Sequence, residues 1–506
     1  MKNRIRILAT TDMHGYICPY RYSDNAEAEH GCARLKTLID LYRDENTILV
    51  DNGDVLQGSP LQFYHFAREA EETAPITKVM NAMGYDYVNL GNHDFNYGEN
   101  ALLKHLDSLN MPCLTSNVIH RGKPLNPTYA IREIAGVKIA LFGVVTHCIP
   151  RWEKPDNIKT FRFKDAFVTA KKTVEMIRKL ERPNYVIGIY HGSFERDPKT
   201  GISYNKENGE NQAYQMIREI DGLDVLITGH THGELCGRSF NTTYAQAGKN
   251  AEALACVDIY TDTGIIEPHV LKADTAPNEE ILRVVRQTEE RCQKWLDTPL
   301  GKSRMNLKIE DEFTARLYKS QLATFLNMVQ KEVSGADLSA VSLFQNAVGF
   351  GSEITMRELV STYVYPNSLM VLKINGAILR EYLEKTAEFW SLDDNRIIVN
   401  PRFIKPKKKM YFYDMVDGIE YDINIRNDIG HRVTSILYQG KEVTDDMEFT
   451  LVVSNYRAAG GSEYTMLKKG ELIRDCMNDM VEEIALWIIQ HRVIEFEPVN
   501  NIHVHR

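Results

Sequence analysis

The chain has 506 residues, of which 43% are hydrophobic and 25% are charged. At about 100–200 residues per domain, this length predicts more than one domain and excludes a small disulfide-stapled module. The 69 acidic and 60 basic side chains leave a net charge of −9. Such a chain has no overall positive field to bind a nucleic-acid polymer or an acidic membrane surface, so we expect neither as a partner, and any phosphate group must be bound locally.

Targeting and cysteine patterns favour an ordinary intracellular protein. The sequence is already apolar at Ile5 and has no stretch of about eighteen consecutive apolar residues. We therefore expect a cytoplasmic location as the sequence is written, and an extracytoplasmic one if a signal peptide has been removed. The eight cysteines form no CxxC pair, which favours buried free thiols over a zinc knuckle or a disulfide framework.

The first half of the chain alternates short β-branched runs with helical stretches. The predicted strands are Ile5–Leu8, Ile48–Val50, Tyr87–Leu90, Ile139–Val145, Val186–Tyr190 and Val225–Thr228. The predicted helices are Leu35–Tyr42, Ala101–Leu109, Phe167–Leu180 and Tyr214–Ile220. This alternation predicts an α/β fold over residues 1–276, with a sheet covered by helices.

A charged helix, Pro277–Leu296, separates this half from a region with a different sequence pattern. We assign residues 277–309 to a linker. Residues 310–506 predict a second, α+β domain. Its expected helices are Ala315–Val333, Met356–Tyr363, Gly376–Phe389 and Asp479–His491, and its expected strands lie around Met370–Ile374, Tyr421–Ile425 and Phe449–Val453. The last histidines, His503 and His505, are expected in a mobile tail.

Metal-ligand side chains follow five of the predicted strands of the first half. In chain order these side chains are Asp12 and His14, Asp54, Asn92 with His93, His191, and His230 with His232. Binding sites in open α/β sheets form at this carboxyl edge. Imidazole, carboxylate and carboxamide ligands without a thiolate suit Mn²⁺, Zn²⁺ or Fe²⁺ at a catalytic site. Leaving His93 aside, seven ligands exceed the need of one ion and suit two ions that share one carboxylate, for which Asp54 is the natural bridge.

Five sequence blocks resemble those of the calcineurin-like metallophosphoesterases, in the same order: ATTDMHG, DNGDVLQGS, LGNHDFNYG, YHG and ITGHTHG. The segments ADLSAVSLFQNA, YVYPNSLMVLKINGAILREYLE and VVSNYRAAGGSEYTML are similar to the C-terminal domain of the 5′-nucleotidase family. The resemblance implies an N-terminal metallophosphoesterase α/β sandwich joined by a linker helix to a C-terminal α+β domain that binds nucleotides.

The resemblance also implies roles for individual residues. One metal would be held by Asp12, His14, Asp54 and His232, and the other by Asp54, Asn92, His191 and His230. The two ions would be Mn²⁺ or Zn²⁺, with Fe²⁺ and Co²⁺ as further candidates. Hydroxide between the metals would attack phosphorus while His93 stabilises charge on the reacting group.

Asn96 departs from the pattern of many 5′-nucleotidases, which have an acidic residue three positions after this histidine. Asn96 accepts a hydrogen bond but supplies no charge. We place His93 and Asn96 in the catalytic set, and Asn96 resembles the branch that hydrolyses 2′,3′-cyclic nucleotides and 3′-nucleotides. A simple turn residue before Tyr97 is the alternative interpretation.

Two tyrosines, Tyr365 and Tyr456, lie where the family stacks the nucleobase between two rings. We expect them to face each other across a base, with Asn367 and Arg457 as further substrate-binding residues. Arg357 and Arg457 are weaker candidates, because either could be an ordinary surface residue.

Three functions remain open from the sequence. The first is a two-metal phosphoesterase that opens 2′,3′-cyclic nucleotides to 3′-nucleotides and then releases phosphate from these. The second is a 5′-nucleotidase or nucleotide-sugar hydrolase on the same scaffold. The third is a nucleotide-binding protein without catalysis, which the intact ligand set disfavours.

Overall fold

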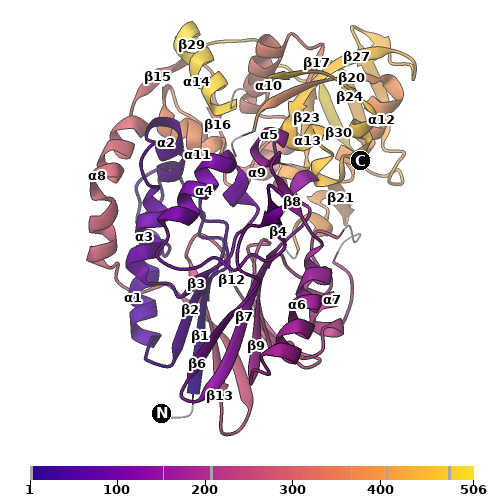
Figure 1. Cartoon of the computed structure of the whole chain (residues 1–506). Coiled ribbons are helices and arrows are strands. Elements are labelled where there is room, and N and C mark those ends of the chain that lie inside the picture. The colour runs from indigo at the N-terminus through magenta and orange to yellow at the C-terminus, as the bar shows by residue number, and fades with distance from the viewer. Residues whose placement is uncertain (1–3, 152, 205–208, 366, 406–407, 477–479) are drawn as a thin grey trace. The chain divides into compact units, whose positions relative to one another are not determined.

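The computed structural model describes residues 4–151, 153–204, 209–365, 367–405, 408–476 and 480–506 (Figure 1). The chain forms two compact units, Met1–Cys292 and Gln293–Arg506. The boundary between them falls inside helix α8 (Glu279–Leu296), where the sequence predicts a helix from Pro277 to Leu296. Among the described residues, no helix is both long and apolar enough to cross a membrane. The eight cysteines are free thiols.

The first unit contains two large β-sheets. One has the strand order β14-β13-β1-β2-β3, and the other has the order β11-β12-β10-β9-β7-β6. The strands of the first sheet are β1 (Arg4–Thr10), β2 (Thr47–Asp51), β3 (Tyr87–Val88), β13 (Ala253–Tyr260) and β14 (Ile265–Lys272). Those of the second are β6 (Ala130–Ile134), β7 (Val137–Val145), β9 (Tyr185–His191), β10 (Val225–Thr228), β11 (Glu234–Ser239) and β12 (Thr242–Ala247). A small third sheet joins β4 (Val118–His120), β5 (Lys123–Pro124) and β8 (Phe161–Phe163).

The alternation of side chains along the strands builds two cores. Ile187 and Ile189 of β9 pack with Ile5 and Ile7 of β1 in the core between the two sheets. The side chain of Val186, the residue before Ile187, faces the opposite way, into a core that β9 shares with helices. Because successive strand residues point to opposite faces, a strand covered on both faces needs apolar residues on both, as Val186, Ile187 and Ile189 of β9 show.

Helices cover the outer faces of this sandwich. Helix α6 (Ala166–Leu180) and helix α7 (Ala213–Glu219) lie together on one side, and α1 (Cys32–Tyr42) and α3 (Pro75–Met83) lie on the other (Figure 1). Helix α6 buries Ala166, Ala170, Val174 and Ile177, a helical spacing of three and four residues. The remaining helical segments of the unit are α2 (Pro60–Arg68), η1 (His93–Phe95), α4 (Gly98–Ser108), η2 (Ile149–Arg151) and α5 (Pro155–Ile158).

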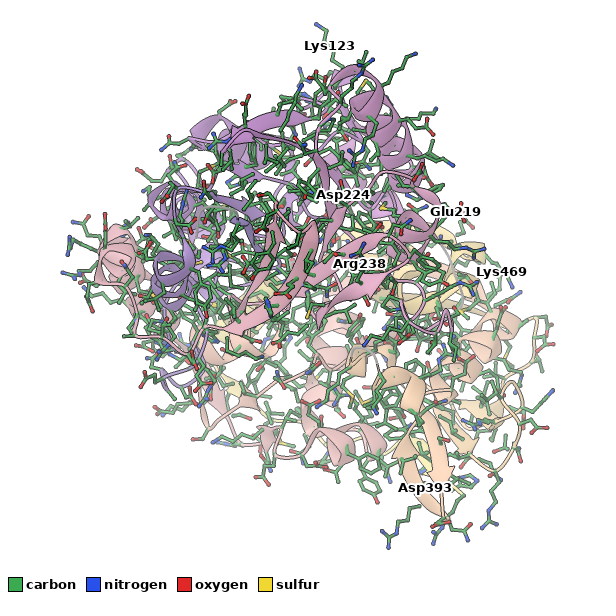
Figure 2. The ribbon with its side chains drawn as sticks, turned by 90° about the horizontal axis from the view of Figure 1, so that it is seen from below. Lys123, Glu219, Asp224, Arg238, Asp393 and Lys469 are labelled. Atoms are coloured by element: carbon green, nitrogen blue, oxygen red, sulfur yellow. The ribbon has the colours of Figure 1, made fainter. Side chains whose placement is uncertain are left out.

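Asp224 fixes the amino-terminal end of strand β10 (Figure 2). Its carboxylate accepts a hydrogen bond from the backbone N–H of Val186 at 2.7 Å and pairs with Arg178 at 2.5 Å. β9 and β10 are parallel, with Val225 opposite Ile187. This anchor helps to hold the register in which the carboxyl ends of both strands meet.

The second unit is built on a mixed five-stranded sheet of order β23-β17-β27-β20-β28 and a four-stranded sheet of order β26-β25-β24-β30. The strands are β17 (Leu338–Ser342), β20 (Leu369–Asn375), β23 (Asp414–Asp417), β24 (Glu420–Asn424), β25 (Val433–Tyr438), β26 (Lys441–Glu442), β27 (Glu448–Ser454), β28 (Glu471–Cys476) and β30 (Ile502–His505). The helices are α9 (Glu312–Leu317), α10 (Gln321–Ser334), α11 (Met356–Thr362), α12 (Gly376–Ala387), α13 (Asn455–Ala458) and α14 (Met480–His491). A small three-stranded sheet has the order β19 (Glu353–Thr355), β15 (Pro299–Ser303), β29 (Val493–Ile494). Two strand pairs are β16 (Leu307–Lys308) with β18 (Gly349–Phe350), and β21 (Trp390–Asp393) with β22 (Arg396–Val399). The predicted fold class, α/β followed by α+β, is confirmed.

The prediction of one helix over Ala315–Val333 is wrong. The chain breaks between α9 and α10 at Lys319, whose φ is +49°, and Ser320 caps α10 by accepting a hydrogen bond from the Ala323 N–H. The Lys319 ammonium is buried, where it pairs with Asp417 and donates to Asn501 Oδ1 at 2.7 Å. This buried pairing favours the break over a continuous helix.

The expectation of a mobile tail at His503 and His505 is also wrong. Both residues lie in β30, which runs parallel to β24 with Ile502 opposite Tyr421. Ile502 is buried, and the backbone N–H of Tyr421 donates to the carbonyl of Asn501 at 2.9 Å. Strand pairing together with the burial of Ile502 fixes this end of the described chain.

Candidate metal centre

All seven predicted metal ligands follow the carboxyl ends of strands in the two sheets of the first unit. Asp12 and His14 follow β1, Asp54 follows β2, Asn92 follows β3, His191 ends β9, and His230 and His232 follow β10. β1, β2 and β3 run parallel to one another, as do β9 and β10, so each sheet brings its ligands to a single edge.

Buried asparagines join these two edges. Asn52, after β2, donates from Nδ2 to the carbonyl of Tyr190 at 3.0 Å. Asn89, after β3, donates from Nδ2 to Asn52 Oδ1 at 3.0 Å and to the carbonyl of Val144 at 2.9 Å. Because Tyr190 and Val144 belong to the second sheet, these bonds hold the two ligand-bearing edges together.

The ligand atoms gather in two groups. Asp12, His14 and His232 form one, and Asp54, His191 and His230 form the other, with the ligand atoms of each group within 4.8 Å of one another. In the first group, His14 Nε2 lies 3.0 Å from His232 Nε2, which is 3.5 Å from Asp12 Oδ1.

In the second group, His191 Nε2 lies 3.2 Å from Asp54 Oδ2. Asn92 joins this group, since its Oδ1 is 2.8 Å from His230 Nδ1. All seven predicted ligands are therefore placed in these two groups.

Five of the seven candidate ligands have left-handed backbone conformations. Their φ angles are +52° for Asp12, +49° for His14, +59° for Asp54, +70° for His230 and +60° for His232. Non-glycine residues rarely adopt this region, and such strain costs of order 1–3 kcal/mol per residue unless the surroundings impose it. The backbone is thus shaped to direct these side chains inward.

Hydrogen bonds to the remaining ring nitrogens select which nitrogen of each histidine faces the centre. His14 Nδ1 donates to the carbonyl of Gln57 at 2.9 Å, and His191 Nδ1 donates to the carbonyl of Asn52 at 2.6 Å. Carbonyls only accept, so the proton lies on Nδ1 and Nε2 is left as the ligand atom. His230 is held in the opposite sense, with Nε2 2.7 Å from Glu210 Oε1 and Nδ1 toward Asn92.

The loop that carries Asp54 is held by Asp94, which is fully buried. Its carboxylate accepts four backbone N–H bonds of 2.8–3.0 Å, from Asp54, Val55, Leu56 and Gly91. Burial and the nearby charge of Asp54 raise the pKa of Asp94, while the four donors favour its ionised form. Asp94 therefore shapes the turn that presents Asp54.

The electrostatics of the cluster fit a bound cation. Burial lowers the pKa of His14 to about 4, so its imidazole is neutral and able to ligate a metal. Burial also opposes charging of His191, but the carboxylates of Asp54 and Asp12 outweigh it and raise the pKa of His191 to about 10. Without another cation, the carboxylates thus hold a proton on His191.

Two buried atoms support the same conclusion. Asp54 Oδ2 and His191 Nε2 are buried and lie 3.2 Å from each other, and neither makes a hydrogen bond to any further described residue. Buried polar atoms are normally satisfied, because leaving one unpaired costs free energy. A divalent ion between Asp54 and His191 would satisfy both, and the donor set of carboxylate, carboxamide and imidazole suits Mn²⁺ or Zn²⁺.

The predicted catalytic pair lies beside this centre. His93 Nδ1 is 2.7 Å from Asn96 Oδ1. The backbone N–H of His93 donates to Asp54 Oδ1 at 2.7 Å, and its ring centroid is 5.5 Å from that of His14. His93 is therefore adjacent to both candidate metal groups.

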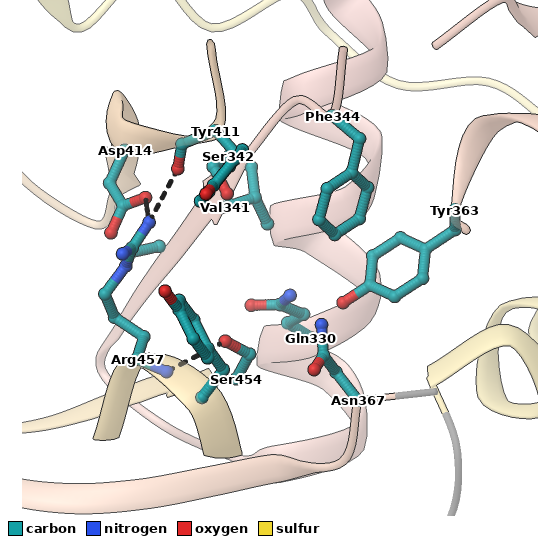
Figure 3. Close-up of a pocket in the computed structure, with 12 residues that line it drawn as sticks. Gln330, Val341, Ser342, Phe344, Tyr363, Asn367, Tyr411, Asp414, Ser454 and Arg457 are labelled. Atoms are coloured by element: carbon teal, nitrogen blue, oxygen red, sulfur yellow. Dashed lines mark hydrogen bonds and ion pairs between the residues drawn. The ribbon is translucent and has the colours of Figure 1, made fainter. Parts of the chain in front are cut away.

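The second unit contains a small pocket of about 40 Å³ that includes three of the four predicted substrate-binding residues (Figure 3). Asn367, Tyr456 and Arg457 line it together with Phe344 and Tyr363. Tyr365 is not among the described residues that line this pocket. Its ring instead meets the edge of Phe344, with centroids 5.1 Å apart.

Arginines in the second unit are bound within the fold. Arg457 is buried, and its guanidinium donates to Asp414 Oδ1 at 2.7 Å and to the carbonyl of Tyr411 at 2.9 Å (Figure 3). Arg357 pairs with Asp297 at 2.6 Å. These contacts indicate that Arg457 shapes the pocket wall.

Sequence reasoning missed several residues around the centre. Glu210, Asp94, Asn52 and Asn89 orient the ligands or the loops that carry them. Asn52 and Asp94 lie inside the sequence motifs that contain the ligands Asp54 and Asn92. This closeness in sequence to a ligand is the signal that could have identified them. Glu210 lies 20 residues before His230 in a loop with no distinctive pattern.

Comparisons with known proteins cover both units. Residues 5–234 match the family described as calcineurin-like phosphoesterase, and residues 300–469 match that described as 5′-nucleotidase, C-terminal domain. A 2′,3′-cyclic-nucleotide 2′-phosphodiesterase/3′-nucleotidase of Yersinia enterocolitica is 27% identical over 90% of this chain and 81% of its own length.

Two further proteins are similar over almost the whole chain. The trifunctional nucleotide phosphoesterase protein YfkN of Bacillus subtilis is 24% identical over 98% of this chain, which spans only 38% of that protein. The crystal structure of a candidate 5′-nucleotidase from Staphylococcus aureus is 28% identical, with a TM-score of 0.93 over 99% of this chain and 100% of that one.

Replacing Asp54 by Asn should remove metal and activity together. The amide keeps the shape but loses the charge that both candidate groups depend on, so we expect loss of at least one metal equivalent and a fall in turnover of more than about 10²-fold. Metal analysis of dialysed protein and phosphate release measure the two effects. The exposed residue Asp107 offers the matched control Asp107→Asn. Full metal content and full turnover in Asp54→Asn would contradict the assignment.

Replacing Asp94 by Asn should weaken the centre indirectly. An amide presents only one oxygen, so its NH₂ group must face backbone donors that the carboxylate now satisfies. We expect the free energy of unfolding to fall by about 1–3 kcal/mol and metal affinity to fall by about 10–100-fold. Denaturant titration and metal titration measure these changes. An unchanged metal affinity would show that Asp94 does not position Asp54.

Proposed function

This chain is a calcineurin-like phosphoesterase with a 5′-nucleotidase C-terminal domain, and we propose that it opens 2′,3′-cyclic nucleotides to 3′-nucleotides and then releases phosphate from these. The predicted family resemblance is confirmed by both domain matches. The chain is therefore a metal-dependent phosphoester hydrolase on a nucleotidase scaffold. The substrate is the part that we propose.

The observation that carries the proposed substrate is the pairing of His93 with an amide. Asn96 Oδ1 lies 2.7 Å from His93 Nδ1, in the position where many 5′-nucleotidases have an acidic side chain. The similarity to the Yersinia enterocolitica protein over 90% of the chain supports the same substrate class. The nucleotide is recognised as a small molecule, in agreement with the net charge of −9.

The metal ligands are assigned as the sequence predicts. Asp12, His14 and His232 would hold one divalent ion, and Asn92, His191 and His230 would hold the other. Asp54 would bind both, and Mn²⁺ or Zn²⁺ suits these donors best, with Fe²⁺ and Co²⁺ as alternatives. When bound, two such ions supply an activated water molecule and stabilise charge on the phosphate.

The protein itself orients the reacting groups. The Asp54 carboxylate accepts the backbone N–H of His93, which ties the histidine to the ligand loop. With Nδ1 directed to Asn96, His93 holds or releases a proton at Nε2, and this atom would stabilise charge on the leaving oxygen. Holding these groups in place lowers the barrier by reducing the motion needed to reach the transition state.

A 5′-nucleotidase or nucleotide-sugar hydrolase is the second candidate. The structural similarity to the Staphylococcus aureus protein, a candidate 5′-nucleotidase, favours it. Both functions use the same metal centre, so the position of the phosphate on the ribose distinguishes them.

A substrate panel tests the proposal. We expect kcat/KM for 2′,3′-cyclic AMP and for 3′-AMP to exceed that for 5′-AMP by at least about tenfold, which corresponds to roughly 1.4 kcal/mol of transition-state stabilisation. Under saturating Mn²⁺, phosphate release measures turnover of 3′-AMP and 5′-AMP, whereas ring opening of 2′,3′-cyclic AMP is followed by chromatography of the 3′-AMP formed and its products. Release of p-nitrophenol from bis(p-nitrophenyl) phosphate gives the rate on a diester without a base. A clear preference for 5′-AMP would favour the second candidate instead.

Tyr456 tests whether the pocket of the second unit contributes to nucleotide binding. Stacking on an aromatic ring is worth about 1–3 kcal/mol per base, so Tyr456→Ala should raise KM for 3′-AMP by about tenfold or more. KM for p-nitrophenyl phosphate should hardly change, because this ester has no base. Tyr365→Ala is the matched comparison, since Tyr365 is outside the lining of the pocket in the structure. Equal effects of Tyr456→Ala on both substrates would refute the stacking role.

A further inference from the structure

A chain of three hydrogen-bonded side chains leads away from His93. His93 Nδ1 meets Asn96 Oδ1 at 2.7 Å, and Asn96 Nδ2 donates to Glu153 Oε2 at 2.5 Å. Glu153 lies between η2 and α5, 57 positions after Asn96 in the sequence, and is only 8% exposed. The buried carboxylate of Glu153 is therefore linked to His93 at the candidate active site through a single side chain, that of Asn96.

The surroundings of Glu153 suit its ionised form. Its oxygens accept hydrogen bonds from three donors: Asn96 Nδ2, Asn157 Nδ2 at 2.8 Å and the backbone N–H of Lys154 at 2.7 Å. Burial raises the pKa of Glu153 overall, although these three donors and the charge of His93 oppose the rise. All three partners present N–H groups to the Glu153 oxygens, a pattern that an ionised carboxylate satisfies fully.

This carboxylate determines how Asn96 is oriented. A carboxylate only accepts hydrogen bonds, so Asn96 must present its NH₂ group to Glu153 and its carbonyl oxygen to His93. That oxygen in turn requires a proton on His93 Nδ1. Asn157 supports the arrangement by donating from Nδ2 to the backbone carbonyl of Asn96 at 2.7 Å.

We propose that Glu153 is a positioning residue that acts on His93 through Asn96, so that a His93–Asn96–Glu153 relay replaces the direct histidine–carboxylate pair. The relay fixes the ring orientation of His93, keeps its Nδ1 protonated and reserves Nε2 for the reacting group. It also returns a negative charge to the neighbourhood of the histidine, which Asn96 alone does not supply. The inference rests on the proposed catalytic role of His93.

A purely structural role for Glu153 predicts something different. Glu153 also joins Asn157 of α5 to the η1 region, and a bridge of this kind depends on hydrogen bonds but not on which residue carries the charge. In the relay, the negative charge and the acceptor facing His93 matter, so moving the charge from position 153 to position 96 should preserve function.

The test therefore relocates the carboxylate. In Glu153→Gln, one amide must face three donors, so the orientation of Asn96 is no longer imposed. In the double variant Asn96→Asp/Glu153→Gln, the new carboxylate accepts from His93 Nδ1 and from the Gln NH₂ group, and the Gln carbonyl accepts from Asn157 and Lys154. All partners are again satisfied, and the charge stands directly beside His93.

We expect Glu153→Gln to lower kcat by about 10–100-fold, with KM changed by less than about threefold and metal content unchanged. The double variant should recover most of the kcat that Glu153→Gln loses on p-nitrophenyl phosphate, the substrate without a base. Glu175→Gln, the same chemical change at an exposed position of α6, is the control, and His93→Ala sets the lower limit of activity. Each protein is assayed with 3′-AMP and with p-nitrophenyl phosphate, alongside metal analysis.

The relay would be overturned by wild-type kcat in Glu153→Gln, by no recovery in the double variant, or by loss of metal in parallel with loss of activity. Wild-type turnover in His93→Ala would remove the premise and overturn the relay as well. A wild-type protein that cleaves p-nitrophenyl phosphate but not 3′-AMP would contradict only the proposed substrate. Assays with p-nitrophenyl phosphate would then still show whether the Glu153 carboxylate determines kcat.

Discussion

Buried negative charge at the meeting edge of two sheets is the constraint on which the first unit depends. Asp12 and Asp54 are almost fully buried, and four imidazoles and one carboxamide converge on them. Charge in such a place is tolerated only when it is paired, and the raised pKa of His191 shows how strongly the carboxylates require a positive partner. Divalent ions would satisfy this requirement and would also give the site its chemistry.

Much of the surrounding structure serves to hold this arrangement. Five left-handed backbone conformations cost free energy that no isolated loop would tolerate. The Asp94 carboxylate with its four N–H donors holds the turn at Asp54, and the asparagine bonds hold the two ligand-bearing edges together. A site preorganised in this way does not have to rearrange when metal and substrate bind.

The candidate metal ligands can be predicted from the sequence because they share one simple rule. Each of the seven directly ends or closely follows a strand, and parallel strands bring their carboxyl ends to one edge. The residues that orient these ligands follow no such rule. Glu210 and Glu153 lie in loops, and they meet His230 and Asn96 only through tertiary folding.

The second unit shows where local sequence patterns reach their limit. Most of the helices and strands that were predicted match observed ones within a few residues, although many of the unit's strands were not predicted. The break at Lys319 depends on a buried pair with Asp417, 98 positions away. The two tyrosines expected to face each other do not both line the pocket, because Phe344 and Tyr363 occupy part of its wall. Aromatic residues near a turn do not reveal from sequence which of them faces a pocket and which packs against a neighbour.

The most direct test of the central claim is a crystal structure of the Mn²⁺-loaded protein with anomalous scattering measured at the manganese edge. Our account predicts two anomalous peaks about 3.5–4 Å apart, with the Asp54 carboxylate contacting both, His14 and His232 at one, and His191 and His230 at the other. A single peak, or two peaks that Asp54 does not join, would contradict it.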